Sequence, residues 1–199
     1  MGCSFLFLFV FCSACASSEE YPNDWSPIVF DDSDCPDISG TYDNVGLYAS
    51  RDKMLFETGY LLSNYVFEDA LNDVSFFAGV VISRSDGNEL RIAISSKDRT
   101  SDTHTLSREM GHFACEGGKI WIAETTWGVH QLYGPAYAKT RIGLAKTKDG
   151  SLVGEIQTSG VGAIFVVIPV KWSSEDYVRW SRFDPEYWDA FEKAMEEIW

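Results

Sequence analysis

Positive charge is scarce in this chain of 199 residues, which has 16 Lys and Arg against 30 Asp and Glu and a formal net charge of −14. Proteins that bind nucleic acids or anionic lipid by charge use Lys and Arg to neutralise phosphates. The composition therefore argues against a nucleic-acid partner. It also predicts that whatever attaches the protein to a membrane is not electrostatic.

Histidine is also scarce, and the motifs of common enzyme classes are missing. The 3 histidines are His104, His112 and His130. Their spacing fits no zinc motif, and no H-E-x-x-H sequence occurs. The chain contains no G-x-S-x-G nucleophile elbow, no P-loop and no dinucleotide-binding fingerprint. We therefore expect no catalytic residue, and the protein is predicted not to be an enzyme.

One short acidic cluster deserves consideration as a cation site. Asp31, Asp32, Asp34 and Asp37 lie close together, as calcium ligands often do. However, Pro36 falls where a calcium-binding loop needs a ligand, and the Gly and the later Glu of an EF-hand are not in register. We expect neither a metal site nor a cofactor.

The chain has no hydrophobic run long enough to cross a membrane as a helix. Its longest apolar run is FLFLFVFC at residues 5–12, and even residues 3–16 fall short of the roughly 20 residues required. The run has the length of the hydrophobic region of a signal peptide, with the small residues Ser13 and Ala14 where cleavage would occur. We predict a signal peptide over residues 1–14.

Cys-Ser-Ala-Cys at residues 12–15 resembles the lipobox of bacterial lipoproteins. By that resemblance Cys15 becomes the N-terminus, carries acyl chains such as palmitate, and anchors the protein to the lipid bilayer. Ala16, rather than Asp, follows it, which in Gram-negative sorting implies the outer membrane, facing the periplasm. A cleaved soluble exported protein and an uncleaved membrane anchor are the alternatives.

The segment that follows Cys15 carries charge of only one sign. It contains acidic residues and no Lys or Arg before Arg51. Like charges repel one another and favour an extended chain. We predict an acidic tether over residues 15–40, whose last third packs on the domain. A single β-rich domain is predicted over residues 41–199.

Turn signals predict an antiparallel β fold after residue 73. Three pairs of alternating or apolar segments each flank a Gly-containing turn: Val74–Arg84 and Asn88–Ser95 around Asp86-Gly87, Gly111–Cys115 and Lys119–Thr125 around Gly117-Gly118, and Thr140–Thr147 and Ser151–Thr158 around Asp149-Gly150. Consecutive hairpins form a meander. The fold class is therefore mainly β, as a sandwich or a partly open barrel.

Three further elements are predicted. Gly162–Trp172 reads as one longer strand, in which Pro169 requires an edge position or a bulge. Tyr60–Leu71 has the pattern of a short helix. A C-terminal amphipathic helix follows Asp184 as N-cap and Pro185 at the first helical position. Its apolar side chains recur at helical spacing: Trp188, Phe191, Met195, Ile198 and Trp199.

Several short segments together resemble a group of small, uncharacterised proteobacterial lipoproteins. These segments are CPDISGTY at residues 35–42, LLS at 61–63, TLS at 105–107, FACEGG at 113–118, KDGSL at 148–152 and IPV at 168–170. The resemblance spans residues 35–183 and implies export and a pairing of Cys35 with Cys115. It brings no catalytic or binding residue with it.

The allocation of the 5 cysteines agrees with that implication. If Cys3 and Cys12 leave with the signal peptide and Cys15 is acylated, Cys35 and Cys115 remain. An even remainder in an oxidising compartment suggests one disulfide. Two buried free thiols are the alternative.

Three functions are open at this point. The leading one is a non-enzymatic envelope lipoprotein that presents a β domain to a protein or cell-wall partner. The second is a module for a small apolar ligand, with a barrel interior lined by Phe76, Trp121 and Phe165 under the C-terminal helix. The third is a hydrolase that uses His104 or His112 with a serine.

Overall fold

A computed structural model of the chain describes residues 15–18, 20–30, 35–49, 61–66, 79–85, 88–96, 99–100, 103–131, 134–164 and 168–186. The predicted signal peptide and most of the predicted C-terminal helix lie outside these residues. Among the described residues, no helix is long and apolar enough to cross a membrane.

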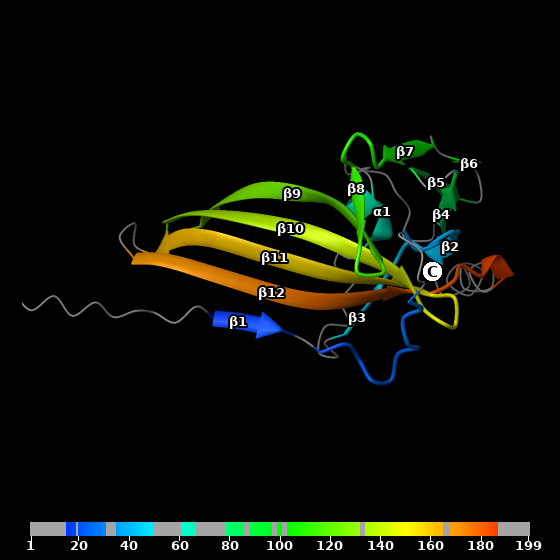
Figure 1. Ribbon diagram of the computed structural model, residues 1–199. Helices are drawn as coiled ribbons and strands as arrows, with labels where there is room; N and C mark the ends of the chain where they lie inside the picture. The colour runs from blue at the N-terminus through cyan, green and yellow to red at the C-terminus, as the bar shows by residue number, and fades with distance from the viewer. Residues whose placement is uncertain are drawn as a thin grey trace, which may run out of the picture.

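The larger of two sheets has 7 strands and is built around four long ones. Its order is β1 (Cys15–Ser18), β12 (Ile168–Trp180), β11 (Leu152–Ile164), β10 (Gly134–Lys146), β9 (Lys119–Gln131) and β8 (Phe113–Glu116), with β3 (Leu47–Tyr48) also on β12. Strands β9 to β12 are each 13 residues long. They lie side by side and extend well beyond the smaller sheet (Figure 1).

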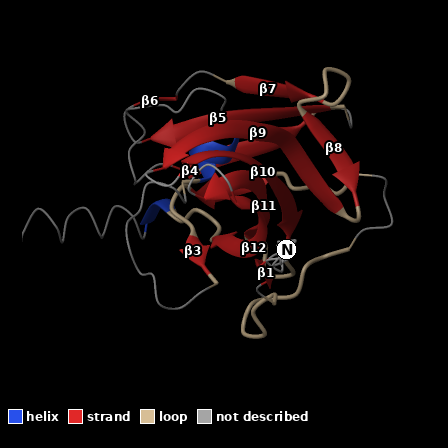
Figure 2. Cartoon of the chain, turned by 90° about the vertical axis from the view of Figure 1, so that its left-hand side faces the viewer, coloured by secondary structure: helices blue, strands red, loops and turns tan. Residues whose placement is uncertain are grey.

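The smaller sheet has 5 strands and packs against one end of the larger one (Figures 1 and 2). Its order is β2 (Gly40–Asp43), β4 (Gly79–Arg84), β5 (Glu89–Ser96) and β6 (Arg99–Thr100), with β7 (His104–Ser107) also on β5. The two sheets do not close into a barrel. The mainly β prediction is confirmed, and the arrangement is consistent with a sandwich.

The three predicted hairpins are confirmed by the strand pairing. Strands β4 and β5, β8 and β9, and β10 and β11 are antiparallel neighbours. Gly117 and Gly118 connect β8 to β9 with φ angles of 60° and 71°. Only glycine adopts such angles without steric cost, so this turn depends on both residues.

A core of apolar side chains lies between the two sheets. Among the largest fully buried side chains, Trp180, Leu144 and Leu152 come from the large sheet, and Tyr42 and Ile82 from the small one. The helix α1 (Leu62–Val66) contributes Leu62 and Val66 to the same cluster. Among the described residues, α1 thus confirms the central part of the helix predicted over residues 60–71, together with its buried side.

The prediction of one strand over Gly162–Trp172 is wrong. The segment is divided between β11, which ends at Ile164, and β12, which begins at Ile168, and the two strands run antiparallel. The reversal was not predicted because the apolar, largely β-branched run is continuous there and contains no Asp-Gly or Gly-Gly pair. Pro169 pairs with Ala163 of β11, and the described pairing of β1 with β12 begins later, at Trp172. The expected edge position of Pro169 thus agrees with the described pairing.

The described parts of residues 15–40 differ from an extended tether. Strand β1 pairs with β12, and the Val29 amide donates to the Lys146 carbonyl at 2.8 Å. The ring of Tyr21 lies 5.6 Å from that of Tyr177. Apolar and aromatic side chains in this segment therefore outweigh its charge repulsion and hold it against the large sheet. Its last part enters the core through Cys35 and Ile38, as expected for the last third.

The start of the C-terminal helix has the predicted N-cap contact. The Glu186 amide donates to the Asp184 carboxylate at 3.0 Å, and Pro185 occupies the first helical position. An N-cap side chain accepts such a bond from the second or third helical residue. The predicted apolar side of this helix lies outside the described residues.

The turn between β10 and β11 gives the fold a pH-dependent contact. The Asp149 carboxylate accepts hydrogen bonds from the Thr147 hydroxyl and from the Ser151 amide, the latter at 3.0 Å. These bonds, the one from Thr147 foremost, hold the pKa of Asp149 below its usual 3.8. The stabilisation is therefore fully present above pH 3.8 and is lost as the pH falls through the lower folded-state value.

Replacement of Asp149 by Asn tests this contact. Because the group is exposed and its charge is screened, we expect a loss of less than about 1 kcal/mol at neutral pH. The difference between wild type and Asp149→Asn in urea unfolding should shrink below pH 3.8. Glu116→Gln, at an exposed carboxylate in another hairpin, is the matched control. A difference that does not change with pH would contradict the account.

Candidate functional site: the outer face of the large sheet

The large sheet has one face in the core and one face turned away from the smaller sheet. Side chains alternate between the faces along each strand. Ile142 and Leu144 of β10 and Ile156 of β11 are buried in the core. Their neighbours at alternate positions therefore lie on the opposite face, which we term the outer face.

A connected polar network occupies the middle of the outer face. The Lys119 ammonium forms an ion pair with the buried Glu155 carboxylate. The Gln157 amide donates to Glu155 at 2.5 Å, and the Arg141 guanidinium donates twice to the Gln157 oxygen, at 2.9 and 2.7 Å. The Arg141 guanidinium carbon also lies 4.2 Å from the centroid of the Trp121 ring. Each charge in the network is thus paired or stacked within the sheet.

A glycine makes room for the Trp121 ring in this network. Gly143 pairs with Trp121 across β10 and β9. A Cβ atom at Gly143 would lie only 2.9–3.0 Å from ring atoms of Trp121. Such a contact is too close for an ordinary side chain. The glycine therefore allows Trp121 to lie flat on the sheet, where Arg141 stacks on it.

The end of the outer face near the smaller sheet is covered by the N-terminal segment. Tyr21 contacts Tyr177 edge to face, and the Arg179 guanidinium carbon lies 5.3 Å from the centroid of the Trp25 ring. The Tyr177 hydroxyl donates to the Glu175 carboxylate at 2.9 Å. Burial, together with this bond, raises the pKa of Tyr177. These side chains therefore have a packing role in the fold.

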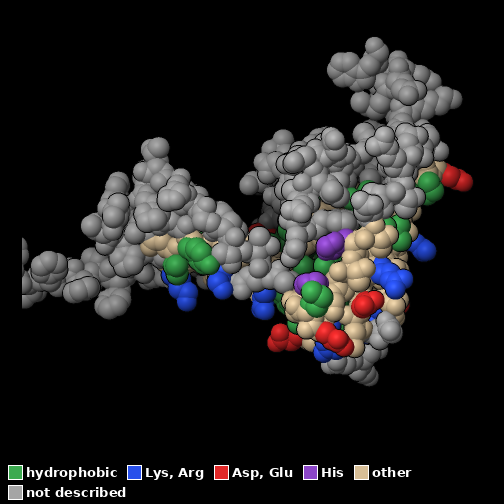
Figure 3. All heavy atoms as spheres, turned by 90° about the horizontal axis from the view of Figure 1, so that it is seen from above, with side chains coloured by type: hydrophobic (Ala, Val, Ile, Leu, Met, Phe, Trp, Pro, Cys, Tyr) green, Lys and Arg blue, Asp and Glu red, His purple; other side chains and the backbone are tan. Residues whose placement is uncertain are grey.

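The other end of the outer face exposes apolar side chains beside lysines. Tyr137 is 47% exposed and Val161 is 53% exposed, and the two residues pair across β10 and β11. Lys171 of β12 pairs with Val161, and Lys139 lies two residues along β10 from Tyr137; both lysines are exposed. We term Tyr137, Lys139, Val161 and Lys171 the distal patch. Hydrophobic side chains with Lys and Arg beside them are visible on the elongated part of the molecule (Figure 3).

The predicted lipidation site lies next to the distal patch. Cys15 is the first residue of β1 and pairs with Trp172 of β12. Trp172 directly follows Lys171 of the patch. The backbone of Cys15 therefore lies on an edge strand of the large sheet, level with Trp172 and four residues from the start of β12.

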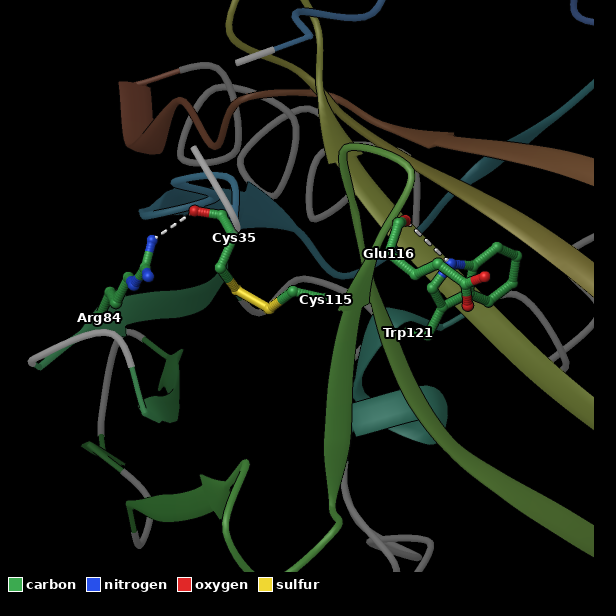
Figure 4. Close-up of a disulfide and its surroundings, with 5 residues drawn as sticks. All are labelled: Cys35, Arg84, Cys115, Glu116 and Trp121. Carbon is green, nitrogen blue, oxygen red and sulfur yellow. Dashed lines mark hydrogen bonds between the residues drawn. A yellow bond between two sulfur atoms is a disulfide. The ribbon is translucent and has the colours of Figure 1, made fainter. Parts of the chain in front are cut away.

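The predicted cysteine pair lies at the opposite end, between the two sheets. Cys35 and Cys115 are joined as a disulfide, with Cα atoms 5.0 Å apart and 80 residues apart in sequence. Cys115 lies in β8 of the large sheet, and Cys35 precedes β2 of the small sheet. The Arg84 guanidinium donates to the Cys35 carbonyl at 2.7 Å (Figure 4). The pair thus lies at disulfide distance, as predicted, and links the sheets.

In comparisons with protein-family models, curated proteins and solved structures, nothing matches this chain. The resemblance to small proteobacterial lipoproteins therefore remains a prediction.

Of the histidines proposed for a hydrolase, His104 is the first residue of β7, and His112 follows the turn between β7 and β8. The His112 Nδ1 atom accepts a hydrogen bond from the backbone amide of Ser107 at 3.1 Å, and the His112 amide donates to the Ser107 carbonyl at 3.0 Å. This nitrogen therefore stabilises the turn between β7 and β8. Within the part of the chain that the structure describes, no cluster of three or more His, Cys, Asp or Glu side chains is arranged to hold a metal ion.

The apolar ligand site predicted inside a barrel is not supported by the fold. The sheets are open, and Trp121 lies on the outer face instead of in an interior. Trp121 falls between the buried Ile120 and Ile122, and alternation along a strand places it on the other side. Phe76 and Phe165, the other proposed lining residues, lie outside the described residues.

Sequence reasoning did not find the distal patch. Residues 126–139 show only weak alternation, and Gly134-Pro135 alone does not indicate a strand pair, so the sequence does not predict the long continuation of β9 or the start of β10. One usable signal was the small-residue composition of residues 158–163, TSGVGA, in which Val161 is the only large side chain. A large apolar residue among small ones on a strand is a candidate for exposure.

Proposed function

We propose that this protein is an exported lipoprotein, anchored by acyl chains on Cys15 to the outer membrane and facing the periplasm. Its β domain is proposed to bind a protein or another component of the cell envelope, without catalysis. The observation that carries the proposal is the short apolar run that ends in Cys-Ser-Ala-Cys at residues 12–15.

Two features of the folded domain support this proposal. The cysteines that remain after processing, Cys35 and Cys115, lie at disulfide distance, which suits an oxidising compartment. Cys15 pairs with β12 in the part of the large sheet that extends beyond the smaller sheet (Figure 1), so acyl chains there would leave the smaller sheet accessible. At the other end, Phe30 is 70% exposed and Met110 is 73% exposed.

Site-specific photocrosslinking in intact cells tests the binding role. A photoreactive amino acid at Met110 or Phe30, both exposed and far from Cys15 in the fold, is expected to give one adduct of defined mass. The unsubstituted protein, irradiated in parallel, is the control. An adduct pattern identical to that control at both positions would contradict the proposed interaction.

A further inference from the structure

We infer that the distal patch lies on the membrane surface and contacts the headgroups of an anionic phospholipid bilayer. This inference rests on the proposed acylation of Cys15. It adds a defined orientation of the domain, with the outer face of the β10–β12 tip directed at the lipid.

The pairing of β1 fixes how far the domain can stand from the membrane. The residue proposed to carry the acyl chains is itself the first residue of β1, paired with Trp172. No flexible residues separate the anchor from the sheet. The distal end is therefore held close to the membrane, in contrast to a domain on a free tether.

The distal patch lies within reach of that anchor. In the order β1, β12, β11, β10, Tyr137 is three strands away from Cys15. With strands about 4.8 Å apart, this corresponds to about 14 Å between their backbones. The headgroup layer of a bilayer is roughly 5–8 Å thick on each side, so a modest tilt brings the whole patch to it.

The chemistry of the patch fits a membrane surface. One row across the strands contains Gly128, Tyr137, Val161 and Lys171. Tyrosine is enriched at membrane interfaces because its ring is apolar and its hydroxyl is polar. Exposed apolar side chains that cost free energy in water are stabilised there.

The two distal rows of the outer face contain basic residues in a protein that is acidic overall. The next row on the same face contains Lys139, Ser159 and Ser173. These two rows carry Lys139 and Lys171 and no Asp or Glu, in a chain whose net charge is −14. Lysines near an anionic leaflet are attracted to it, while the acidic remainder of the domain is repelled. Both effects orient the distal patch toward the lipid.

Lysine footprinting of the acylated full-length protein on vesicles tests the inference. The probe is an amine-acylating reagent followed by peptide mass spectrometry, on vesicles of phosphatidylethanolamine with phosphatidylglycerol. Labelling of Lys139 and Lys171 is expected to be about fivefold lower on the vesicles than in detergent. This factor corresponds to the attraction of one lysine to an anionic surface. Lys148, exposed in the turn at the other end of β10, is the internal control and should stay unchanged.

Several outcomes would overturn the inference. Equal labelling of Lys139, Lys171 and Lys148 on the vesicles would do so, and so would the same protection on vesicles of phosphatidylcholine alone. Protection that depends on protein density, and not on lipid composition, would indicate contact between copies of the chain instead.

The mass of the N-terminal peptide from the same sample shows whether Cys15 is acylated. If it is acylated and Lys139 is unprotected, the orientation is wrong while the proposed anchoring stands; if no acyl chain is present, the proposed function itself fails.

The account also predicts the behaviour of variants. Lys139→Gln should raise the labelling of Lys171 on the vesicles toward the level in detergent, and Lys171→Gln should do the same for Lys139. Lys148→Gln should have no such effect. All three positions are exposed, so these variants are expected to fold normally.

Discussion

Replacement of Cys115 by Ser is expected to lower the free energy of unfolding by about 4 kcal/mol. The bond joins residues that are 80 apart in sequence, and breaking it releases this long loop in the unfolded chain. It also links β8 of the large sheet to the segment that leads into β2 of the small one. A loss of this size is a large part of the stability of a typical domain. Urea unfolding of the purified variant measures it.

Reduction of the wild-type protein provides the matching comparison. Under a thiol reductant, the wild type should unfold at the same urea concentration as Cys115→Ser, because both lack the crosslink. Ala114→Ser, at the exposed neighbouring position on β8, controls for the introduction of a hydroxyl group. If wild type and Cys115→Ser unfold at the same midpoint without reductant, and thiol titration finds two free cysteines, the disulfide is absent in the mature protein.

Replacement of Cys15 by Ser is expected to abolish acylation completely. Serine offers no thiol for the thioether bond, and no other described cysteine is available because Cys35 and Cys115 are paired. Each buried CH₂ of an acyl chain contributes about 0.8 kcal/mol, so the loss of all chains removes the lipid anchor altogether. Incorporation of labelled palmitate into the protein, in a Gram-negative host, measures the effect.

The matched control for this variant is Cys12→Leu. This change restores the leucine that a lipobox usually carries three residues before its cysteine, and it leaves Cys15 in place. Its palmitate incorporation should equal or exceed that of the wild type. Palmitate incorporation into Cys15→Ser at the wild-type level would place the modification elsewhere.

Local turn chemistry explains why the hairpins were predictable. Gly-containing pairs such as Gly117-Gly118 and Asp149-Gly150 mark reversals that are fixed by backbone sterics, and the structure places turns at both. The reversal between Ile164 and Ile168 has no such pair, so the sequence predicts the end of β11 and the start of β12 as one strand. Periodicity indicates which face a residue lies on but does not indicate where a continuous β run folds back.

Long-range pairing explains what the sequence could not reveal about the N-terminal segment. Residues 15–18, CASS, are small and carry no strand pattern, yet they form a parallel strand on β12. These residues form a strand because they pair with the exposed edge of β12. No local feature of residues 15–18 predicts that pairing. The position of Cys15 beside Trp172, on which the proposed membrane orientation depends, therefore needed the fold.

The cysteine pair shows the opposite case. The predicted signal peptide, the predicted acylation of Cys15 and parity among the 5 cysteines single out Cys35 and Cys115, which lie at disulfide distance. The network of Lys119, Glu155 and Arg141 on the outer face was not predicted, because its members come from three strands whose register is set by the whole sheet.

The mass of the N-terminal peptide of the protein purified from a Gram-negative envelope tests acylation most directly. The expected peptide begins at Cys15 and carries the added mass of a diacylglyceryl group and an amide-linked acyl chain. A peptide that begins at Met1, or one that begins at an unmodified residue, would contradict the lipid anchor and everything inferred from its position.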